Sequence, residues 1–167
     1  LSTNAGVQTD NIFWNNTFPT STVFSVAGPG DNSTNASGED IIAYCFHSVE
    51  GYSKFGTYTD SVVGSDFENT SPFVYTGFRP AWLMIKSTSS GRDWVIYDNK
   101  RTPDNGVYLE SNTSTGEQTD ATNHDVSFLS NGFKIRGGSG DINTTGESYV
   151  YMCFADQPFK YANGGTE

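Results

Sequence analysis

The chain has 167 residues, enough for one domain with a sizeable core and too few for two. Only 17% of the residues are charged and the chain is rich in Ser, Thr, Asn and Gly, which excludes a coiled coil or a helical bundle. Against 9 Lys and Arg stand 19 Asp and Glu, without any basic stripe, so we expect neither nucleic acid nor a membrane as a partner.

Short apolar runs alternate with turn-forming clusters along the chain. Such spacing predicts an all-β fold, an antiparallel β-sandwich. The candidate strands, in chain order, are Thr22–Val26, Asp40–Ser48, Lys54–Tyr58, Phe73–Thr76, Ala81–Ser87, Asp93–Asp98, Val107–Glu110, Val126–Leu129, Phe133–Arg136 and Ser148–Ala155.

Two of these strand predictions are specific. Asn131-Gly132 separates two runs and supplies the positive φ angles of a tight hairpin turn. Residues 81–87 are apolar on both faces, with Leu83 on one and Met84 on the other, so this strand should be central.

The predicted organisation is an N-terminal arm or linker over residues 1–20, a β-sandwich over 21–160 and a flexible tail over 161–167. Because the first residue is Leu1 rather than Met, we expect the chain to be a processed product or a piece of a longer polypeptide.

The chain has two cysteines, which end two similar segments. Residues 30–46 and 138–154 each combine a polar loop with a strand that finishes in Cys-Phe. Either two neighbouring strands of one sandwich have the same pattern of a turn followed by a buried strand, or the segments arose by duplication. Aromatic neighbours suggest that Cys45 and Cys153 are buried, reduced and slow to react, so no disulfide is expected.

No catalytic constellation emerges from the sequence. Glycosidases need two facing carboxylates, whereas Glu39 and Asp40 point to opposite faces and Glu147 stands alone. His47 and His124 lack partners at metal-ligand spacing, and no nucleophile-elbow motif occurs. We therefore expect a protein that is not an enzyme.

Two acidic, Asn-rich loops are candidate calcium sites. Asp31 lies in the first, and Asp141 and Asn143 lie in the second. Calcium needs six to eight oxygen ligands, and these residue types supply them. Turns require the same residues, so turn formation is the alternative and no obligate cofactor is expected.

Exposed aromatic rings are the usual platform for glycans. Trp14, Tyr52 and Tyr58 are the candidate contacts to a glycan or partner, whereas Trp82 and Trp94 lie in mid-strand and are expected in the core.

Four strings carry a family resemblance: GYSKFGTY (51–58), FVYTGFRPAWLMIK (73–86), FLSNGFKIR (128–136) and YVYMCFA (149–155). Together they resemble a module of tailed-phage virion and tail-fibre proteins. The resemblance implies a jelly roll of the concanavalin-like or laminin-G-like type, with no catalytic motif to transfer.

These observations predict a non-enzymatic structural or adhesion protein of a phage virion, either a tail-fibre or a surface-decoration subunit. It would form a homo-oligomer through its sandwich faces and contact other virion proteins. The alternative is a lectin-like module that binds a glycan on the host surface.

Overall fold

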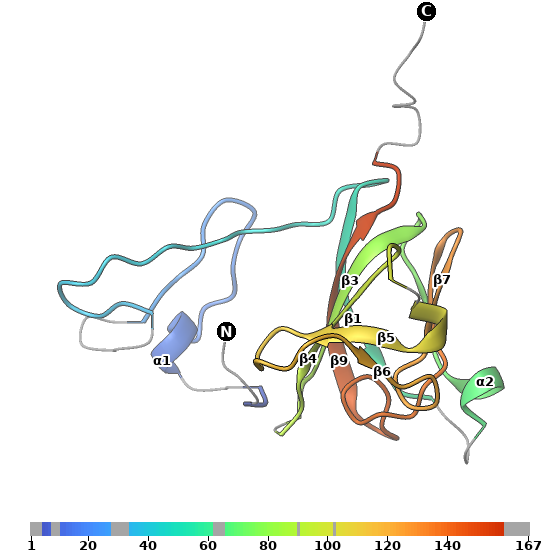
Figure 1. Ribbon diagram of the computed structural model, residues 1–167. Coiled ribbons are helices and arrows are strands. Elements are labelled where there is room, and N and C mark those ends of the chain that lie inside the picture. Colours follow the sequence, from blue (N-terminus) through green and yellow to red (C-terminus); the bar gives the residue numbers. More distant parts are fainter. Residues whose placement is uncertain are drawn as a thin grey trace, which may run out of the picture. The chain divides into compact units, whose positions relative to one another are not determined.

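The computed structural model describes residues 5–7, 11–27, 34–61, 66–89, 91–101 and 103–158. The chain divides into two compact units. Val7–Phe46 form the smaller, and the larger unit, which begins again at His47, holds all the strands (Figure 1). The expected boundary at residue 20 does not coincide with this division.

The larger unit is all-β and contains two antiparallel sheets. Six strands, in the order β1-β9-β3-β4-β5-β6, form one sheet, and β2-β8-β7 form the other (Figure 1). The strands are β1 (Ser53–Thr59), β2 (Phe73–Tyr75), β3 (Pro80–Ser87), β4 (Trp94–Asp98), β5 (Val107–Glu110), β6 (Gln118–Thr119), β7 (Val126–Leu129), β8 (Gly132–Ile135) and β9 (Ser148–Ala155). Three short helical turns complete the described elements: α1 (Asn11–Trp14), α2 (Phe67–Thr70) and a 3₁₀ turn over Pro103–Asn105.

Both sheets contribute to one buried core, as a β-sandwich requires. Leu83, Ile85 and Val95 of the larger sheet are fully buried, as are Phe133 and Ile135 of the smaller. The prediction that 81–87 is central is confirmed, because β3 pairs with β4 on one side and β9 on the other.

Two of the predicted strands are wrong. Residues 22–26 and 40–48 form no strand, although both are rich in β-forming residues. Strand propensity reflects the packing of side chains against neighbouring strands, so β-forming residues alone do not produce a strand. The similarity between 30–46 and 138–154 is therefore not a similarity of structure, since only the second segment ends in a strand.

The hairpin of β7 and β8 is confirmed, but its glycine has a different role. Neither Asn131 nor Gly132 has a positive φ angle. A Cβ on Gly132 would lie 2.1 Å from the carbonyl oxygen of Val74, so glycine allows β2 to approach β8 closely. No helix among the described residues is long and apolar enough to span a membrane.

The two cysteines differ in environment, contrary to expectation. Both are free, but Cys45 is exposed and only Cys153 is buried. Burial raises the pKa of the Cys153 thiol to about 12. The interpretation of Cys45 as core was wrong, because residues 40–48 form no strand of the sandwich.

Alkylation should separate the two thiols. A thiolate is the reactive species, so iodoacetamide at pH 8 should modify Cys45 quickly and Cys153 at least 10-fold more slowly, with both modified in denaturant. Peptide mass spectrometry of timed samples measures both rates, and Cys45→Ser identifies the fast site. Equal rates in the native protein would contradict this assignment.

Candidate functional site

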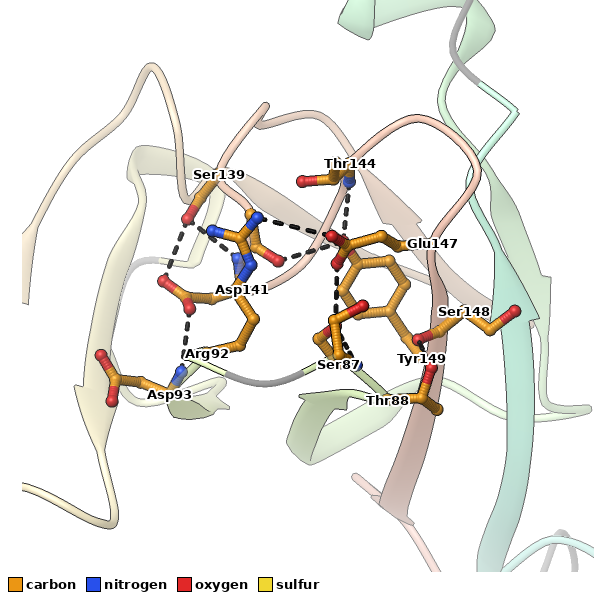
Figure 2. Close-up of polar contacts among 12 residues, drawn as sticks. Ser87, Thr88, Arg92, Asp93, Ser139, Asp141, Thr144, Glu147, Ser148 and Tyr149 are labelled. Carbon is orange, nitrogen blue, oxygen red and sulfur yellow. Dashed lines mark hydrogen bonds and ion pairs between the residues drawn. The ribbon is translucent and has the colours of Figure 1, made fainter. Parts of the chain in front are cut away.

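A polar cluster at one end of the six-stranded sheet joins the β3–β4 loop to the β8–β9 loop. Glu147, at the start of β9, accepts hydrogen bonds from Ser87 Oγ at 2.9 Å and Tyr149 OH at 3.5 Å. Arg92 forms an ion pair with its other oxygen at 3.5 Å. Figure 2 shows these side chains converging on the carboxylate. Every oxygen of Glu147 thus has a donor.

Asp141 occupies the second half of the cluster. Its carboxylate accepts hydrogen bonds from the Asp93 main-chain N–H at 2.9 Å and from Ser139 Oγ at 3.1 Å (Figure 2). His124 Nε2 lies 3.4 Å from the same carboxylate, and its ring stacks on Tyr108 at a centroid distance of 4.0 Å. Asp141 therefore anchors the loop after β8 to two other segments.

The pKa of Asp141 is set by opposing effects. Burial alone would raise it, but the hydrogen bonds from His124, the Asp93 N–H and Ser139 lower the pKa below its ordinary value. A carboxylate held ionised by fixed donors stabilises loops and is poorly suited to donate a proton as a general acid.

The hydroxyl of Ser139 donates to Asp141, a carboxylate that also accepts the Asp93 N–H and lies 3.4 Å from His124 Nε2. Among the described residues, no group of three or more His, Cys, Asp or Glu side chains is placed to hold a metal ion. The hydrogen bonds of the cluster join the loops that carry Arg92, Ser139 and Glu147.

The predicted calcium residues do not form one site. Asp31 lies outside the described residues. Asn143 is buried and donates to Ser71 Oγ and the Gly137 carbonyl, each at 3.0 Å, whereas Asp141 faces Asp93 and Ser139. The side-chain oxygen of Asn143, Oδ1, is buried without a hydrogen-bond partner. The hydrogen bonds of both residues hold the segment between β8 and β9 in place.

The three predicted aromatic contacts differ in their exposure to solvent. Trp14 is 52% exposed and meets Phe24 edge to face, and Tyr52 is 40% exposed. Tyr58 is buried, contrary to expectation, because its side chain points inward from β1 and its OH donates to the Ile142 carbonyl at 2.7 Å. Tyr58 therefore has no accessible ring face.

The outer face of the six-stranded sheet is apolar, which sequence analysis did not identify. One row of directly opposed residues crosses five strands, and all its members are partly exposed: Phe55, Met152, Met84, Ile96 and Leu109. Trp82 and Phe154 flank this row with ring centroids 5.8 Å apart. Trp82 and Trp94 thus lie on the outer face rather than in the core.

The smaller sheet carries a second aromatic surface. Phe73 and Tyr75 project from the same face of β2 and are 46% and 65% exposed. Phe73 packs over Gly132, where a Cβ would lie 3.0 Å from its ring. The two rings therefore form an exposed aromatic pair on this face of β2, called here the platform of Phe73 and Tyr75.

Acid should destabilise the protein through Asp141. Its folded pKa lies below the unfolded value, so its stabilisation is complete above about pH 4 and is lost as the pH falls through the folded pKa. Asp141→Asn should lower the free energy of unfolding at pH 7 by about 1–3 kcal/mol and flatten its decline between pH 4 and pH 2. Urea titrations at each pH measure both effects, with exposed Asp104→Asn as control. An unchanged pH dependence would contradict this role.

Comparison with known proteins gives a family but no function. A family model described as a domain of unknown function (DUF7483) matches residues 1–158, so the chain belongs to this family. No curated protein and no solved structure matches the chain.

Proposed function

We propose that the protein is a non-enzymatic structural or adhesion module that assembles with copies of itself through β-sandwich surfaces. The outer face of the six-stranded sheet carries this proposal. Its apolar row is five strands wide, and large contiguous apolar surfaces of this kind mark sites of protein association.

The composition of the outer face suits a protein partner. Both methionines of the chain, Met84 and Met152, lie at its centre, beside a shallow depression of about 90 Å³. Methionine adapts its shape to a facing surface. Lys86 lies on the same face but is buried, and its ammonium donates to the carbonyls of Ser87 and Ser89.

The polar cluster supports a non-enzymatic role. Glu147 and Asp141 each accept hydrogen bonds from more than one fixed donor. An acid or nucleophile of a hydrolase needs a free functional group facing a substrate. The surfaces, rather than these carboxylates, are therefore the better candidates for function.

The resemblance to tailed-phage modules supports a place in the virion, as a tail-fibre or surface-decoration subunit that also contacts other virion proteins. We assign the sandwich to the concanavalin-like or laminin-G-like jelly rolls. Two antiparallel sheets, with the last strand β9 between β1 and β3, agree with such a topology. Peptide mass spectrometry of purified virions encoding this chain tests the location.

The oligomeric state tests self-association. Light scattering during size-exclusion chromatography at micromolar concentration should show a defined homo-oligomer. Because the net charge is −10, added salt should strengthen an apolar association by screening repulsion between copies. Met84→Glu should shift the protein toward monomer, whereas Thr115→Glu in an exposed loop should not. A monomer under all conditions would refute the proposal.

A glycan-binding module is the second candidate, favoured by the platform of Phe73 and Tyr75. Two exposed rings on one strand can stack against successive sugars. The exposed Asn131 lies beside them, because its main-chain carbonyl accepts a hydrogen bond from Thr76 N–H at 3.0 Å. A glycan array should then show binding that Tyr75→Ala abolishes and Trp14→Ala preserves. Absence of any bound glycan would remove this candidate.

A further inference from the structure

Each ring of the platform of Phe73 and Tyr75 lies close to a glycine. A Cβ on Gly132 would lie 3.0 Å from the ring of Phe73, and a Cβ on Gly77 would lie 3.7 Å from the hydroxyl oxygen of Tyr75. Because neither glycine carries a side chain, each ring can lie near the main chain and still be exposed to solvent. Rings supported in this way lose little side-chain freedom when a ligand stacks on them.

A lysine lies beside the platform on the same face of the smaller sheet. Lys134 of β8 is directly opposite Phe73 of β2. The main-chain hydrogen bonds fall on the neighbouring pairs, since Ile135 N–H donates to Pro72 O at 3.1 Å. Opposed residues between such bonds bring their side chains closest together. The platform therefore has a cationic side chain next to its first ring.

The positive charge of Lys134 is not neutralised within the described structure. Its ammonium donates to the main-chain carbonyl of Ser71 at 2.8 Å, and this neutral acceptor positions the side chain without cancelling its charge. Among the described residues no carboxylate forms an ion pair with Lys134, whereas Arg92 and Arg101 are both paired with acidic side chains. An ammonium carries three N–H donors, so donors remain for an anionic ligand.

We propose that the platform of Phe73 and Tyr75, together with Lys134, binds an acidic glycan, a chain of sugars that carry carboxylate groups. The two rings stack on the apolar faces of the sugars, and the Lys134 ammonium donates to the carboxylate of the sugar nearest Phe73. This inference rests on the second candidate function, and it names the class of glycan and the residue that selects it.

The polar groups around the rings favour a glycan over an acidic peptide. Sugar hydroxyls need both donors and acceptors, which the hydroxyl of Tyr75 and the amide of the exposed Asn131 supply. Asn131 is held beside the platform because its main-chain carbonyl accepts from Thr76 N–H and Gly77 N–H, at 3.0 and 3.2 Å. A chain of acidic side chains could pair with Lys134, but it has no flat apolar face to stack on the two rings.

Esterification of the ligand tests the proposal on the unmodified protein. Short oligomers of galacturonate, mannuronate or glucuronate are the probes, and isothermal titration calorimetry measures their binding. The methyl ester of the oligomer that binds best should bind about 10-fold more weakly, because the ester cannot accept a charge-assisted hydrogen bond. Added salt should weaken binding of the acid and leave binding of the ester unchanged.

Lys134→Gln tests whether this residue selects the acid. Glutamine keeps a donor but removes the charge, so binding of the uronate oligomer should fall about 10-fold while binding of its methyl ester stays the same. Lys134→Arg should retain binding of the acid. Lys100→Gln is the matched control, because Lys100 is exposed in the loop after β4. If Lys134→Gln weakens the acid and the ester equally, or neither, the proposal is overturned.

Failure of this inference is distinguishable from failure of the proposed functions. Methyl esters that bind as tightly as the acids would overturn the acidic class and leave a glycan-binding module. Polyglutamate that binds as tightly as the uronates would assign the face to an acidic protein and overturn the inference. Absence of binding to every uronate and every neutral glycan would overturn the inference and the second candidate together. Light scattering decides self-association independently of all these outcomes.

Discussion

Leu83→Ala is expected to lower the free energy of unfolding by about 2–5 kcal/mol, as deletion of a large buried side chain from a packed core does. Leu83 is fully buried on the inward face of β3, the central strand that pairs with both β4 and β9. No neighbour can close the cavity without moving one of these strands. Urea denaturation monitored by tryptophan fluorescence measures the loss.

Met84→Ala is the matched control, because Met84 is the next residue of the same strand and projects from the opposite face. Its partly exposed side chain loses fewer contacts, so the cost should be less than half that of Leu83→Ala. Equal losses would mean that both faces of β3 are equally buried within one chain. The outer face would then not be available for association.

Strand positions could largely be predicted from the sequence. Alternation of residue type is a local property, and it located β5, β7 and β9 at the residues where they occur. β6 was missed because a two-residue strand is too short to show a period. The sequence also shows that both faces of residues 81–87 are apolar. It does not show that the outer face of this strand remains partly exposed.

The polar cluster could not be predicted, because its partners are distant in the sequence. Ser87 and Glu147 are 60 residues apart and meet only because β3 pairs with β9. Glu147 therefore seemed isolated in the sequence. His124 likewise seemed to have no partner, although folding places it beside Asp141. Pairing of strands, rather than local spacing, determines which polar groups meet.

For residues 40–48 the sequence predicts a structure that does not form. These residues have every local property of a buried strand, and the sequence predicts one there. In the described structure these residues form no strand, and Ile42 and Tyr44 are among the most exposed large side chains. Local residue type therefore does not suffice to form a strand, because a strand also needs a neighbouring strand to pair with.

Gly106→Ala is expected to be the most damaging single-methyl addition, by roughly 2–5 kcal/mol. Gly106 precedes β5 with φ +63°, a left-handed conformation that alanine disfavours. A Cβ there would also lie 2.1 Å from the main-chain oxygen of Asp120. That oxygen accepts the His124 N–H at 2.9 Å, so its displacement would disturb the turn that carries His124.

Gly146→Ala separates the cost of the left-handed backbone conformation from the cost of the close approach to Asp120. Gly146 has a similar φ of +79°, but nothing lies within 4 Å of its Cβ position, so alanine there should cost only the backbone strain of about 1–2 kcal/mol. Thermal and urea unfolding of both variants measure the difference. Hydrogen exchange should show faster exchange over residues 118–124 in Gly106→Ala alone. Equal destabilisation of the two variants, with unchanged exchange in that segment, would mean that Gly106 is required for its φ angle and not for the close approach of Asp120.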